Sequence, residues 1–462
     1  MHMTFENRDL FPDEAPSTQP TAVQPKTAAT RATARVQMPD RHQLEFRSSD
    51  LDAVIDPDHR ARLVWAYVER LDLAALYAQI KAVQGGVGRT PIAPEILLSL
   101  WLYATLEGVG SARAVARMCE AHDAYRWLCG GVSVNHHTLS DFRVGHGKIL
   151  DEMLTMSVAS LLEVGAVDLM RVAQDGMRVR ASAGSKSFRR RASLQDFLVE
   201  AKKQVMLLKA QVESDPAIFT RAEQAAKERA ALERQEKIER ALRRLPKLEE
   251  AKARQGEHGK KKVKEPRASM TDADATIMKM PNAGYNPAFN AQLCTDTKTQ
   301  VIVGVDMLCT GADQGQLTPM LAQLEERYHM TPKEYLVDGG YVSGAQIDAA
   351  ELKCTVYAPV PLRTQDKLKP FEPHPKDTPN TARWRARMAT EEAKKIYIER
   401  ASTAECVNAL ARNRGLTKLN VRGQAKTKCV LLMHALAHNL MRIAAIAPQL
   451  LGMGAVRGTN AS

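Results

Sequence analysis

The sequence has few of the features that mark secreted, disulfide-bonded or membrane proteins. Its 462 residues include only seven cysteines, an odd and widely spaced set without a Cys-x-x-Cys pair, which fits a reducing compartment. Residues 1–10 carry Glu6, Arg8 and Asp9 where a signal peptide needs an apolar run. The most apolar stretch, residues 96–106, is about half as long as a bilayer span. We therefore expect a soluble, cytoplasmic protein with no export and no membrane partner.

The composition is that of a folded chain with an excess of positive charge. Aromatic residues are only 5%, but hydrophobic residues reach 44% and charged residues 26%, which excludes a collagen-like or wholly disordered chain. The length corresponds to about three compact units at roughly 150 residues each. Lys and Arg number 65 against 53 Asp and Glu, a net charge of +12. This excess favours an acidic partner, nucleic acid first, with ordinary solubility as the alternative.

The first part of the chain divides into an arm and a helical module. Residues 1–48 are rich in Pro, Thr, Ala and Gln without apolar periodicity and predict a disordered arm. From residue 51 to residue 167 the pattern becomes helical, and Pro94 is placed to open one of the helices. Apolar residues step along one face of another expected helix: Leu71, Leu73, Leu76 and Ile80. We expect an all-α module over residues 51–167.

A helix-turn-helix-like pattern lies within this module. Residues 112–119 predict one short amphipathic helix, and a second helical run, residues 135–146, follows the turn at Gly130 and Gly131. Polar side chains gather at the start of the second helix, where base edges of DNA would be read: Asn135, His136, His137, Thr138, Ser140 and Arg143. His137, Thr138 and Arg143 are the predicted DNA contacts. In the alternative interpretation, Thr138 only caps the helix and the two histidines lie on its rim.

After residue 168 the periodicity changes to that of an α/β protein with a helical insertion. Residues 172–181 predict a strand that contains Asp175. Two amphipathic stretches, residues 194–212 and 222–248, predict a helical hairpin or coiled coil, with breaks at Pro216 and Pro246. This insertion, residues 190–265, ends in a basic run that begins at Lys260 and is typical of a solvated stretch.

The rest of the chain predicts a mixed sheet. The expected strands are residues 290–295, 301–307, 334–338 and 355–360, with a hairpin turn at 296–299. The expected helices are residues 317–328, 345–352, 403–409 and 426–444, and residues 363–379 are expected to form a loop. Outside the insertion, this order of elements is that of an α/β fold with a mixed sheet.

Three acids are placed where a metal site would need them. Asp175 lies inside an apolar strand, where a carboxylate is unfavourable unless something offsets its burial. Asp338 ends a hydrophobic strand, the position where open α/β sheets place ligands, and Glu405 lies near the start of a helix. Carboxylates brought together from separate elements bind hard divalent cations, typically Mg²⁺. Taken singly, each acid has a simpler interpretation, since Asp-Gly is most often a turn and Glu405 is a favourable first-turn acid.

An aromatic and basic set surrounds the third acid. In the spacing Tyr397-x2-Arg400-x4-Glu405-x6-Arg412, a phenol and two guanidinium groups accompany Glu405. An isolated acid needs no such neighbours, and Arg grips phosphate with a bidentate fork. The set therefore predicts a phosphodiester substrate, with Tyr397, Arg400 and Arg412 in contact with DNA.

With these motifs in place, the sequence resembles the bacterial insertion-sequence transposases of the DDE type, in the branch that contains the insertion-sequence 1182 group. The resemblance covers roughly residues 50–445. It is carried by the strings Asn-His-His-Thr-Leu-Ser-Asp-Phe-Arg at 135–143, Asp-Gly at 175–176, Ser-Met-Thr-Asp-Ala-Asp at 269–274, Tyr-Leu-Val-Asp-Gly-Gly-Tyr at 335–341, the 397–412 motif, and Ala-His-Asn-Leu-Met at 437–441.

The resemblance implies an RNase H-like catalytic domain over residues 168–445, followed by a tail over 446–462. Asp175, Asp338 and Glu405 would then be the catalytic and metal-binding triad. Two Mg²⁺ ions are implied, with Mn²⁺ as a substitute. The implied partners are DNA, both terminal inverted repeats and target DNA, and further copies of the chain in a homodimer or higher homo-oligomer. When bound to DNA, such a protein would be associated with the bacterial nucleoid.

The sequence departs from the related signature in two places. Neighbouring branches have x3 between Arg and Glu and a Lys at the last position, whereas here the spacing is x4 and Arg412 takes the place of Lys. The expected function is metal-dependent DNA cleavage and strand transfer at terminal repeats, with the helical insertion mediating dimerisation or clamping DNA. Two rivals stay open: a catalytically inactive DNA-binding protein derived from such a transposase, and a nuclease without strand transfer.

Overall fold

The computed structural model describes residues 50–82, 90–214, 220–257, 265–281, 284–362 and 369–452. These residues belong to one compact unit, Asp50–Ser462. Several predicted features lie outside the described residues: the arm of residues 1–48, the break at Pro216, the basic run at 260–264, residues 363–368 of the expected loop and residues 453–462 of the tail.

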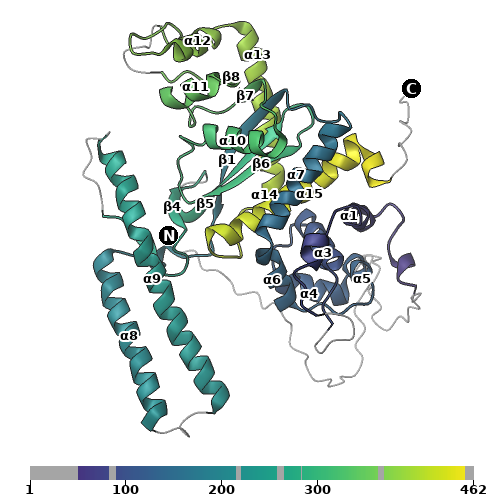
Figure 1. The fold of residues 1–462 in the computed structure, drawn as a ribbon, viewed down its shortest axis with the longest axis vertical. Coiled ribbons are helices and arrows are strands. Elements are labelled where there is room, and N and C mark those ends of the chain that lie inside the picture. The colour runs from purple at the N-terminus through teal and green to yellow at the C-terminus, as the bar shows by residue number, and fades with distance from the viewer. Residues whose placement is uncertain are drawn as a thin grey trace, which may run out of the picture. The chain divides into compact units, whose positions relative to one another are not determined.

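The helical character predicted for residues 51–167 is confirmed (Figure 1). After a 3₁₀ turn at Asp52–Val54, the chain forms α1 (Arg60–Val68), α2 (Ala74–Tyr77), α3 (Pro94–Leu106), α4 (Ala112–Ala121), α5 (Asp123–Cys129), α6 (His136–Gly145) and α7 (Gly147–Glu163). Pro94 opens α3, as expected, because the first turn of a helix does not need its missing N–H. The helix expected along Leu71 to Ile80 is wrong. The chain turns after α1, and only the four-residue α2 forms, so Leu73 and Leu76 reach the core from a turn and a short helix.

The helix-turn-helix-like pattern also needs a correction. A helix that the sequence did not predict, α5, lies between the two expected ones, so the helices flanking Gly130 and Gly131 are α5 and α6. Both glycines have positive φ, 55° and 82°, a conformation that a Cβ atom would strain. The residue that caps α6 is Asn135. Its Oδ1 accepts hydrogen bonds from the backbone N–H groups of His137 at 3.0 Å and Thr138 at 2.9 Å.

The predicted mixed sheet is confirmed, and the described part of it has six strands. They are β1 (Arg171–Arg180), β4 (Thr276–Lys279), β5 (Tyr285–Asp296), β6 (Ile302–Leu308), β7 (Glu334–Leu336) and β8 (Thr355–Tyr357). The order is β4-β5-β1-β7-β8, and β6 also pairs with β5. Strand β1 runs antiparallel to β5 and parallel to β7. Arg171 pairs with Glu334 and Ala173 with Leu336, so the same offset sets Asp338 level with Asp175.

Helices complete the α/β part of the chain. The predicted helices are present as α10 (Leu317–Tyr328), α11 (Gly344–Glu351) and α15 (Gln424–Ile446). Two helices were not predicted, α12 (Pro379–Arg387) and α13 (Glu391–Arg400). Their polar sequences have little apolar periodicity by which a helix could be predicted. A threonine caps each helix: Thr378 Oγ1 accepts a hydrogen bond from the N–H of Thr381, and Thr390 Oγ1 accepts one from the N–H of Ala393. The helix expected at 403–409 is part of a longer helical segment described below.

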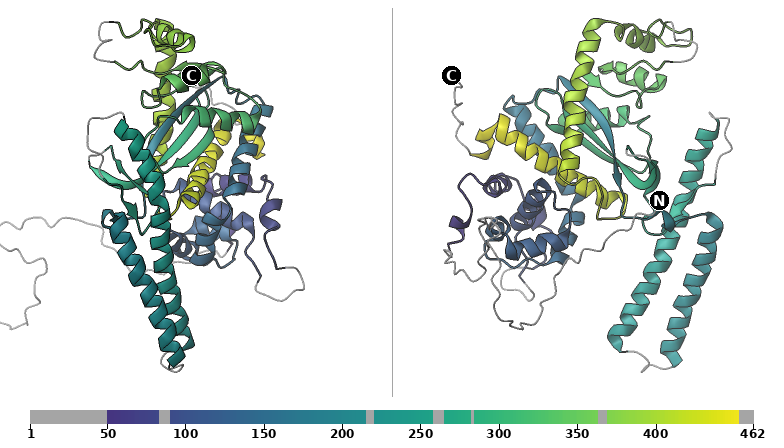
Figure 2. Two further views of the ribbon diagram at one scale, coloured as in Figure 1. Left: turned by 60° about the vertical axis from the view of Figure 1, so that its left-hand side comes forward. Right: turned by 180° about the vertical axis from the view of Figure 1, so that it is seen from behind.

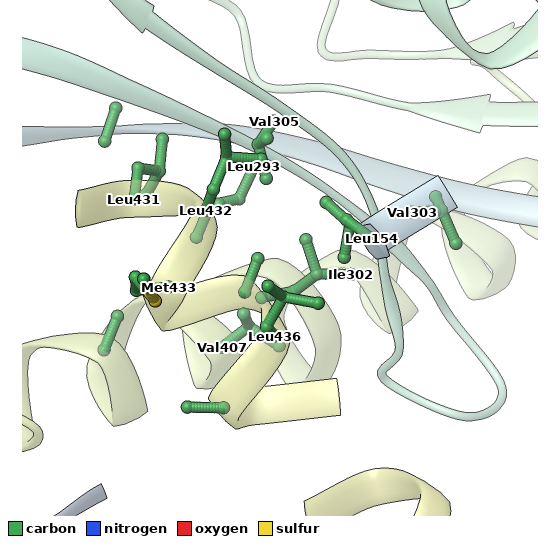
Figure 3. Packing of buried hydrophobic residues seen from close by; sticks show 14 of the residues in the cluster. Leu154, Leu293, Ile302, Val303, Val305, Val407, Leu431, Leu432, Met433 and Leu436 are labelled. Carbon is green, nitrogen blue, oxygen red and sulfur yellow. The ribbon is translucent and has the colours of Figure 1, made fainter. Parts of the chain in front are cut away.

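The core lies where α15 packs against the sheet. Figure 3 shows Leu431, Leu432 and Leu436 of α15 beside Leu293 of β5 and Ile302 of β6. All five side chains are at most 3% exposed, and burying one such side chain contributes about 1.5–3 kcal/mol. Helix α15 is also long and apolar enough to cross a membrane, but 61% of its most apolar window is buried inside the protein. Its hydrophobicity is thus accounted for by packing against β6, α7 and α3.

The predicted helical hairpin is confirmed as α8 (Arg191–Ser214) and α9 (Arg221–Glu257), which lie side by side (Figure 2). The hairpin has its own apolar cluster, separate from the main core: Leu194, Ala201, Ile238, Ala241, Leu245 and Ala268. The short strands β2 (Phe188–Arg189) and β3 (Ala268–Ser269) pair at its base. The break expected at Pro246 is wrong, because α9 continues through it. A proline inside a helix costs about 3 kcal/mol, and α9 is held on either side of it by the buried residues of the hairpin cluster, Leu245 among them.

Candidate active site

Asp175 lies in the middle of β1 and is largely buried. Its Oδ1 accepts a hydrogen bond from the N–H of Gly176 at 2.9 Å and lies 3.1 Å from Nη2 of Arg400. Its Oδ2 accepts from Nδ2 of Asn408 at 2.9 Å. Burial raises the pKa of the Asp175 carboxyl, and the nearby Arg400 partly offsets that rise. A carboxylate in an apolar strand is therefore held by three specific donors.

The simpler interpretation of Asp175-Gly176 as a turn is wrong, because both residues lie within the strand. Gly176 is opposite Gln292 of β5. A Cβ atom at Gly176 would lie 2.3 Å from Oδ1 of Asp313, 2.5 Å from Nε2 of Gln292 and 2.9 Å from Oδ1 of Asn290. The glycine is needed because polar side chains crowd the backbone beside the acid.

Asp338 and Glu405 reach the same place from two other elements. Asp338 follows β7 in a turn, where its Oδ1 accepts from the N–H of Gly340 at 2.8 Å. Oδ2 of Asp338 lies 4.0 Å from Nη2 of Arg400, and Oε1 of Glu405 accepts from Nη1 of Arg400 at 3.0 Å. One guanidinium therefore contacts all three carboxylates. The three acids meet as expected, but Asp338 lies in the turn after β7 and not on the strand itself, so the turn interpretation of Asp338-Gly339 is the correct one.

The helical segment that carries Arg400 and Glu405 contains an irregular turn. Helix α13 ends at Arg400, a π-helical turn spans Ala401–Glu405, and α14 (Cys406–Asn413) follows without a break. A π turn holds one residue more than an α-helical turn. It therefore places residues five apart on the same face, as an α-helix does for residues four apart. The extra residue in the x4 spacing is accommodated by this turn, and Glu405 lies inside a helical segment and not at a helix start.

Arg400 and Tyr397 lie side by side at the acidic site. Arg400 is only 9% exposed. Burial by itself would lower the pKa of Arg400, but Asp175, Tyr397, Asp338 and Glu405 outweigh burial and raise it. Burial raises the pKa of Tyr397, and a hydrogen bond with Arg400 acts in the opposite direction. Arg400 thus stays charged as the counter-ion of the acids.

A buried polar network lies behind the acids. Asp313 accepts hydrogen bonds at Oδ1 from Asn290 at 2.6 Å and from Gln292 at 2.8 Å. Oε1 of Gln292 accepts from Gln174 at 2.9 Å and from the hydroxyl of Tyr341. Buried polar networks of this kind fix side-chain positions when their members are paired. We infer that the network sets the position of β1 and β5 beneath Asp175.

Sequence reasoning missed Asn408 and Asp313. Asn408 lies three residues after Glu405, one helical turn on, so helical spacing from Glu405 is a signal that was available. Asp313 lies in a loop between β6 and α10, and no spacing pointed to it. Both are brought to the site only by the fold.

The three acids are of the chemical type that binds hard divalent cations. Asp175, Asp338 and Glu405 offer carboxylate oxygens, the ligands that Mg²⁺ prefers, and all three already face one positive charge. Within the described residues, no group of three His, Cys, Asp or Glu side chains is arranged to hold a metal. In this structure the cation that the acids share is the Arg400 guanidinium.

The other predicted DNA contacts lie apart from the acids. His137 is exposed and Thr138 is half-buried in the first turn of α6, while Arg412 is exposed on α14. Arg143 is only 7% exposed. Its Nη1 donates to the carbonyl of Gly110 at 2.5 Å, and its guanidinium lies 4.7 Å from the ring centroid of Trp101. The expectation that Arg143 reads base edges disagrees with this placement, because its polar end is used inside the protein.

A mixed sheet with an acidic site, preceded by a helical module, defines an α/β protein with a helical N-terminal part. Two family models match the chain: a transposase domain (DUF772) over residues 49–145 and a transposase DDE domain over residues 265–440. The chain belongs to the DDE transposases of insertion sequences. These matches do not distinguish the 1182 group within them. No curated protein and no solved structure matches the chain.

The two family models match separate parts of the chain. The first covers α1 to α6, and the second contains Asp338, Arg400 and Glu405. Asp175 and the helical hairpin lie between them and are covered by neither. The hydrogen bond from Asn408 and the contact with Arg400 connect Asp175 to the second matched region.

Proposed function

We propose that this transposase binds the terminal inverted repeats of an insertion sequence and catalyses metal-dependent DNA cleavage and strand transfer. Asp175, Asp338 and Glu405 are the proposed catalytic and metal-binding residues. The observation that carries the proposal is the convergence of these three carboxylates, from β1, the turn after β7 and the α13–α14 segment, on the single guanidinium of Arg400.

The three carboxylates are suited to hold Mg²⁺, or Mn²⁺ in its place. Ions held by these carboxylates would supply activation of the attacking water or DNA 3′-hydroxyl and stabilisation of the leaving 3′-oxygen in an in-line displacement. Asn408 and the N–H of Gly176 hold the Asp175 carboxylate in one orientation. Asp338 is held in the same way by the N–H of Gly340.

Arg400 and Tyr397 are suited to hold the DNA backbone beside the break. Arg400 has a planar guanidinium fork that matches a phosphate. It lies next to the acids, and the scissile phosphate must reach these acids for cleavage. The exposed guanidinium of Arg412 is placed for a backbone contact further along α14. The helical module is the proposed reader of the terminal repeats, through His137 and Thr138 at the start of α6. A homodimer or higher homo-oligomer on DNA completes the proposal.

The test replaces each acid by its amide, in Asp175→Asn, Asp338→Asn and Glu405→Gln, at nearly constant shape. We expect each variant to lose cleavage and joining of terminal-repeat DNA while band-shift assays show DNA binding within about twofold of the unmodified protein, because only a metal-binding charge is removed. Retained cleavage in any one variant removes that residue from the proposed triad.

A second assay separates the rivals. Excision of a mini-transposon is measured beside nicking of plain duplex DNA, in the presence of Mg²⁺. Excision and joining support the transposase, nicking alone supports a nuclease, and binding without either reaction supports an inactive DNA-binding protein.

A further inference from the structure

A row of cations lies on one side of α9. Lys237, Arg240, Arg244 and Lys247 follow each other at spacings of three, four and three residues, which places them along one stripe of a helix. Arg243 lies beside them. Together with Arg422, which precedes α15, they line a pocket of about 290 Å³ between α9 and the turn that contains Asp272 and Asp274. We call this feature the basic groove.

The two acids that line the basic groove do not neutralise its positive charge. The acids that line it, Asp272 and Asp274, accept hydrogen bonds from backbone N–H groups at Gly423 (3.1 Å) and Gln424 (2.9 Å). Neither acid forms an ion pair with a cation of the groove in the described part of the chain. Among the lining residues, six cations against two acids leave a formal charge of +4, and three of these cations also pair with glutamates of α9 outside the groove.

The ion pairs that the groove cations do make are weak ones. Arg240 contacts the exposed Glu236 at 3.8 Å, Arg243 contacts the half-buried Glu239 at 3.9 Å, and Lys237 contacts Glu233 at 2.6 Å, all within α9. Such i,i+4 pairs on the surface of one helix contribute only about 0.3–0.5 kcal/mol. Arg244 and Lys247 have no ion pair within the described residues. An anion that binds these cations therefore has only weak ion pairs to break.

The dimensions of the groove fit a polymer of phosphates better than a single anion. From Lys237 to Lys247 the helix rises about 15 Å at 1.5 Å per residue. This distance equals the axial rise of about four base pairs of duplex DNA. Four of the six cations are arginines, whose planar forks bind phosphate oxygens in pairs.

We propose that the basic groove between α9 and the Asp272–Asp274 turn binds the phosphate backbone of DNA, without reading its sequence. This inference rests on the proposed function, in which DNA is the substrate, and it gives the helical insertion a place in substrate binding. The contacts are to backbone only, because long flexible cations in a groove neutralise phosphates and carry no base information.

The test compares two triple variants of the full-length chain. In the first, Arg240→Gln, Arg243→Gln and Lys247→Gln remove three charges from the groove. In the matched control, Lys202→Gln, Lys203→Gln and Lys209→Gln remove three exposed charges from α8, the partner helix of the hairpin. Band shifts without divalent metal measure the affinity for a terminal-repeat duplex and for a scrambled duplex of equal length at several salt concentrations. Thermal unfolding followed by circular dichroism checks that both variants are folded.

For the groove variant we expect the slope of log affinity against log salt to fall by up to about 3, at about 0.9 per lost phosphate contact. At moderate salt we expect at least a tenfold loss of affinity that is equal for the two duplexes. The control should keep the slope of the unmodified chain. Three results would overturn the proposal that the basic groove binds DNA. They are equal salt slopes in all three proteins, an equal loss of affinity in the control, and a loss of affinity confined to the terminal-repeat duplex.

The outcomes also separate this inference from the proposed function. Cleavage and joining by the unmodified chain together with unchanged slopes contradict only the groove. A groove-specific loss of binding in a protein that neither cleaves nor joins DNA supports the groove and contradicts the proposed activity. If the unmodified chain binds neither duplex, both are wrong.

Discussion

At the residue scale, the acidic site consists of three like charges gathered around one buried cation. Arg400 is 9% exposed, and the side chain of Asp175 is 16% exposed, so water screens their contact only in part. The side chains of Asp338 and Glu405 are more open, at 40% and 58%. The arrangement suits a site that exchanges partners, because the two outer carboxylates are exposed to solvent and are therefore open to metal ions and DNA.

The burial of Asp175 leads to a prediction about stability and pH. Because its pKa is raised in the folded protein, the stability that this carboxyl contributes is fully present below its pKa in the unfolded chain. That contribution is lost as pH rises through the raised pKa of the folded state. Asp175→Asn removes the titrating group. We therefore expect the variant to be inactive but more stable at pH 7, by up to about 1 kcal/mol, with the difference vanishing in acid.

Urea unfolding at a series of pH values measures this effect. Asn408 helps the variant, because its Oδ1 is buried without a hydrogen-bond partner in the described structure and an amide flip would present it to the new Asn side chain. Asp338→Asn is the control, since its more exposed side chain should change the pH dependence less. A variant at residue 175 that is less stable than the unmodified chain at pH 7 contradicts the prediction.

At the element scale, the α13–α14 segment shows how a helix holds a motif whose spacing departs from that of its relatives. The π turn at Ala401–Glu405 is flanked by regular helix on both sides. It keeps Tyr397, Arg400, Glu405 and Asn408 directed to the same site, although one more residue separates Arg400 from Glu405 than in the related signature. Isolated π turns inside helices often occur at functional sites.

This explanation predicts the effect of deleting one residue. Removing Ser402, which is exposed, converts the π turn to an α turn and restores the x3 spacing. We expect the deletion variant to fold and to keep its rate of DNA cleavage within about tenfold of the unmodified chain. A small displacement of Glu405 that raises the activation free energy by about 1.4 kcal/mol would slow cleavage by that factor.

Insertion of one alanine after Ser402 is the opposite change. It rotates Glu405 and Asn408 away from Arg400 by about 100°, one residue of an α-helix, and should abolish cleavage. Cleavage assays with Mg²⁺ on both variants decide the matter. Loss of cleavage in a folded deletion variant, or activity in the insertion variant, argues against this role of the turn.

At the scale of the whole molecule, α15 packs against both the N-terminal helices and the sheet. It contacts α3, α6 and α7 as well as β6. A second connection is the carbonyl of Gly110, which accepts hydrogen bonds from Arg143 and from Nδ2 of Asn420, a residue that follows α14. The helices proposed to read DNA are therefore built onto the same core as the acidic site.

This placement predicts different outcomes for two residues that the sequence presented as equivalent. Arg143→Ala removes a buried hydrogen bond and the contact with Trp101, so we expect a loss of about 2 kcal/mol in the free energy of unfolding. The ratio of affinities for terminal-repeat and scrambled DNA should not change. His137→Ala should leave the free energy of unfolding within about 0.5 kcal/mol of the unmodified chain. It should reduce the binding free-energy difference between terminal-repeat and scrambled DNA by about 1–3 kcal/mol.

Urea unfolding and competition band shifts on the two variants provide the measurement. Thr138→Ala is a useful companion, because its hydroxyl lies at the same helix end. Unchanged discrimination in both His137→Ala and Thr138→Ala would contradict the assignment of base reading to the start of α6.

The sequence by itself determined the fold class and most of the strands and long helices, and it singled out the three acids as candidates, because these depend on local apolar periodicity and on motifs with fixed spacing. The two capped polar helices α12 and α13 escaped prediction, since they carry little apolar pattern. Only the tertiary structure decided that Arg400 lies among all three acids, that Asn408 and Asp313 support them, and that Arg143 points inward. Only the tertiary structure, likewise, brings Arg422 beside the cations of α9 to form the basic groove. Each of these depends on contacts between residues far apart in the chain, such as the parallel pairing of β1 with β7, which no local pattern encodes.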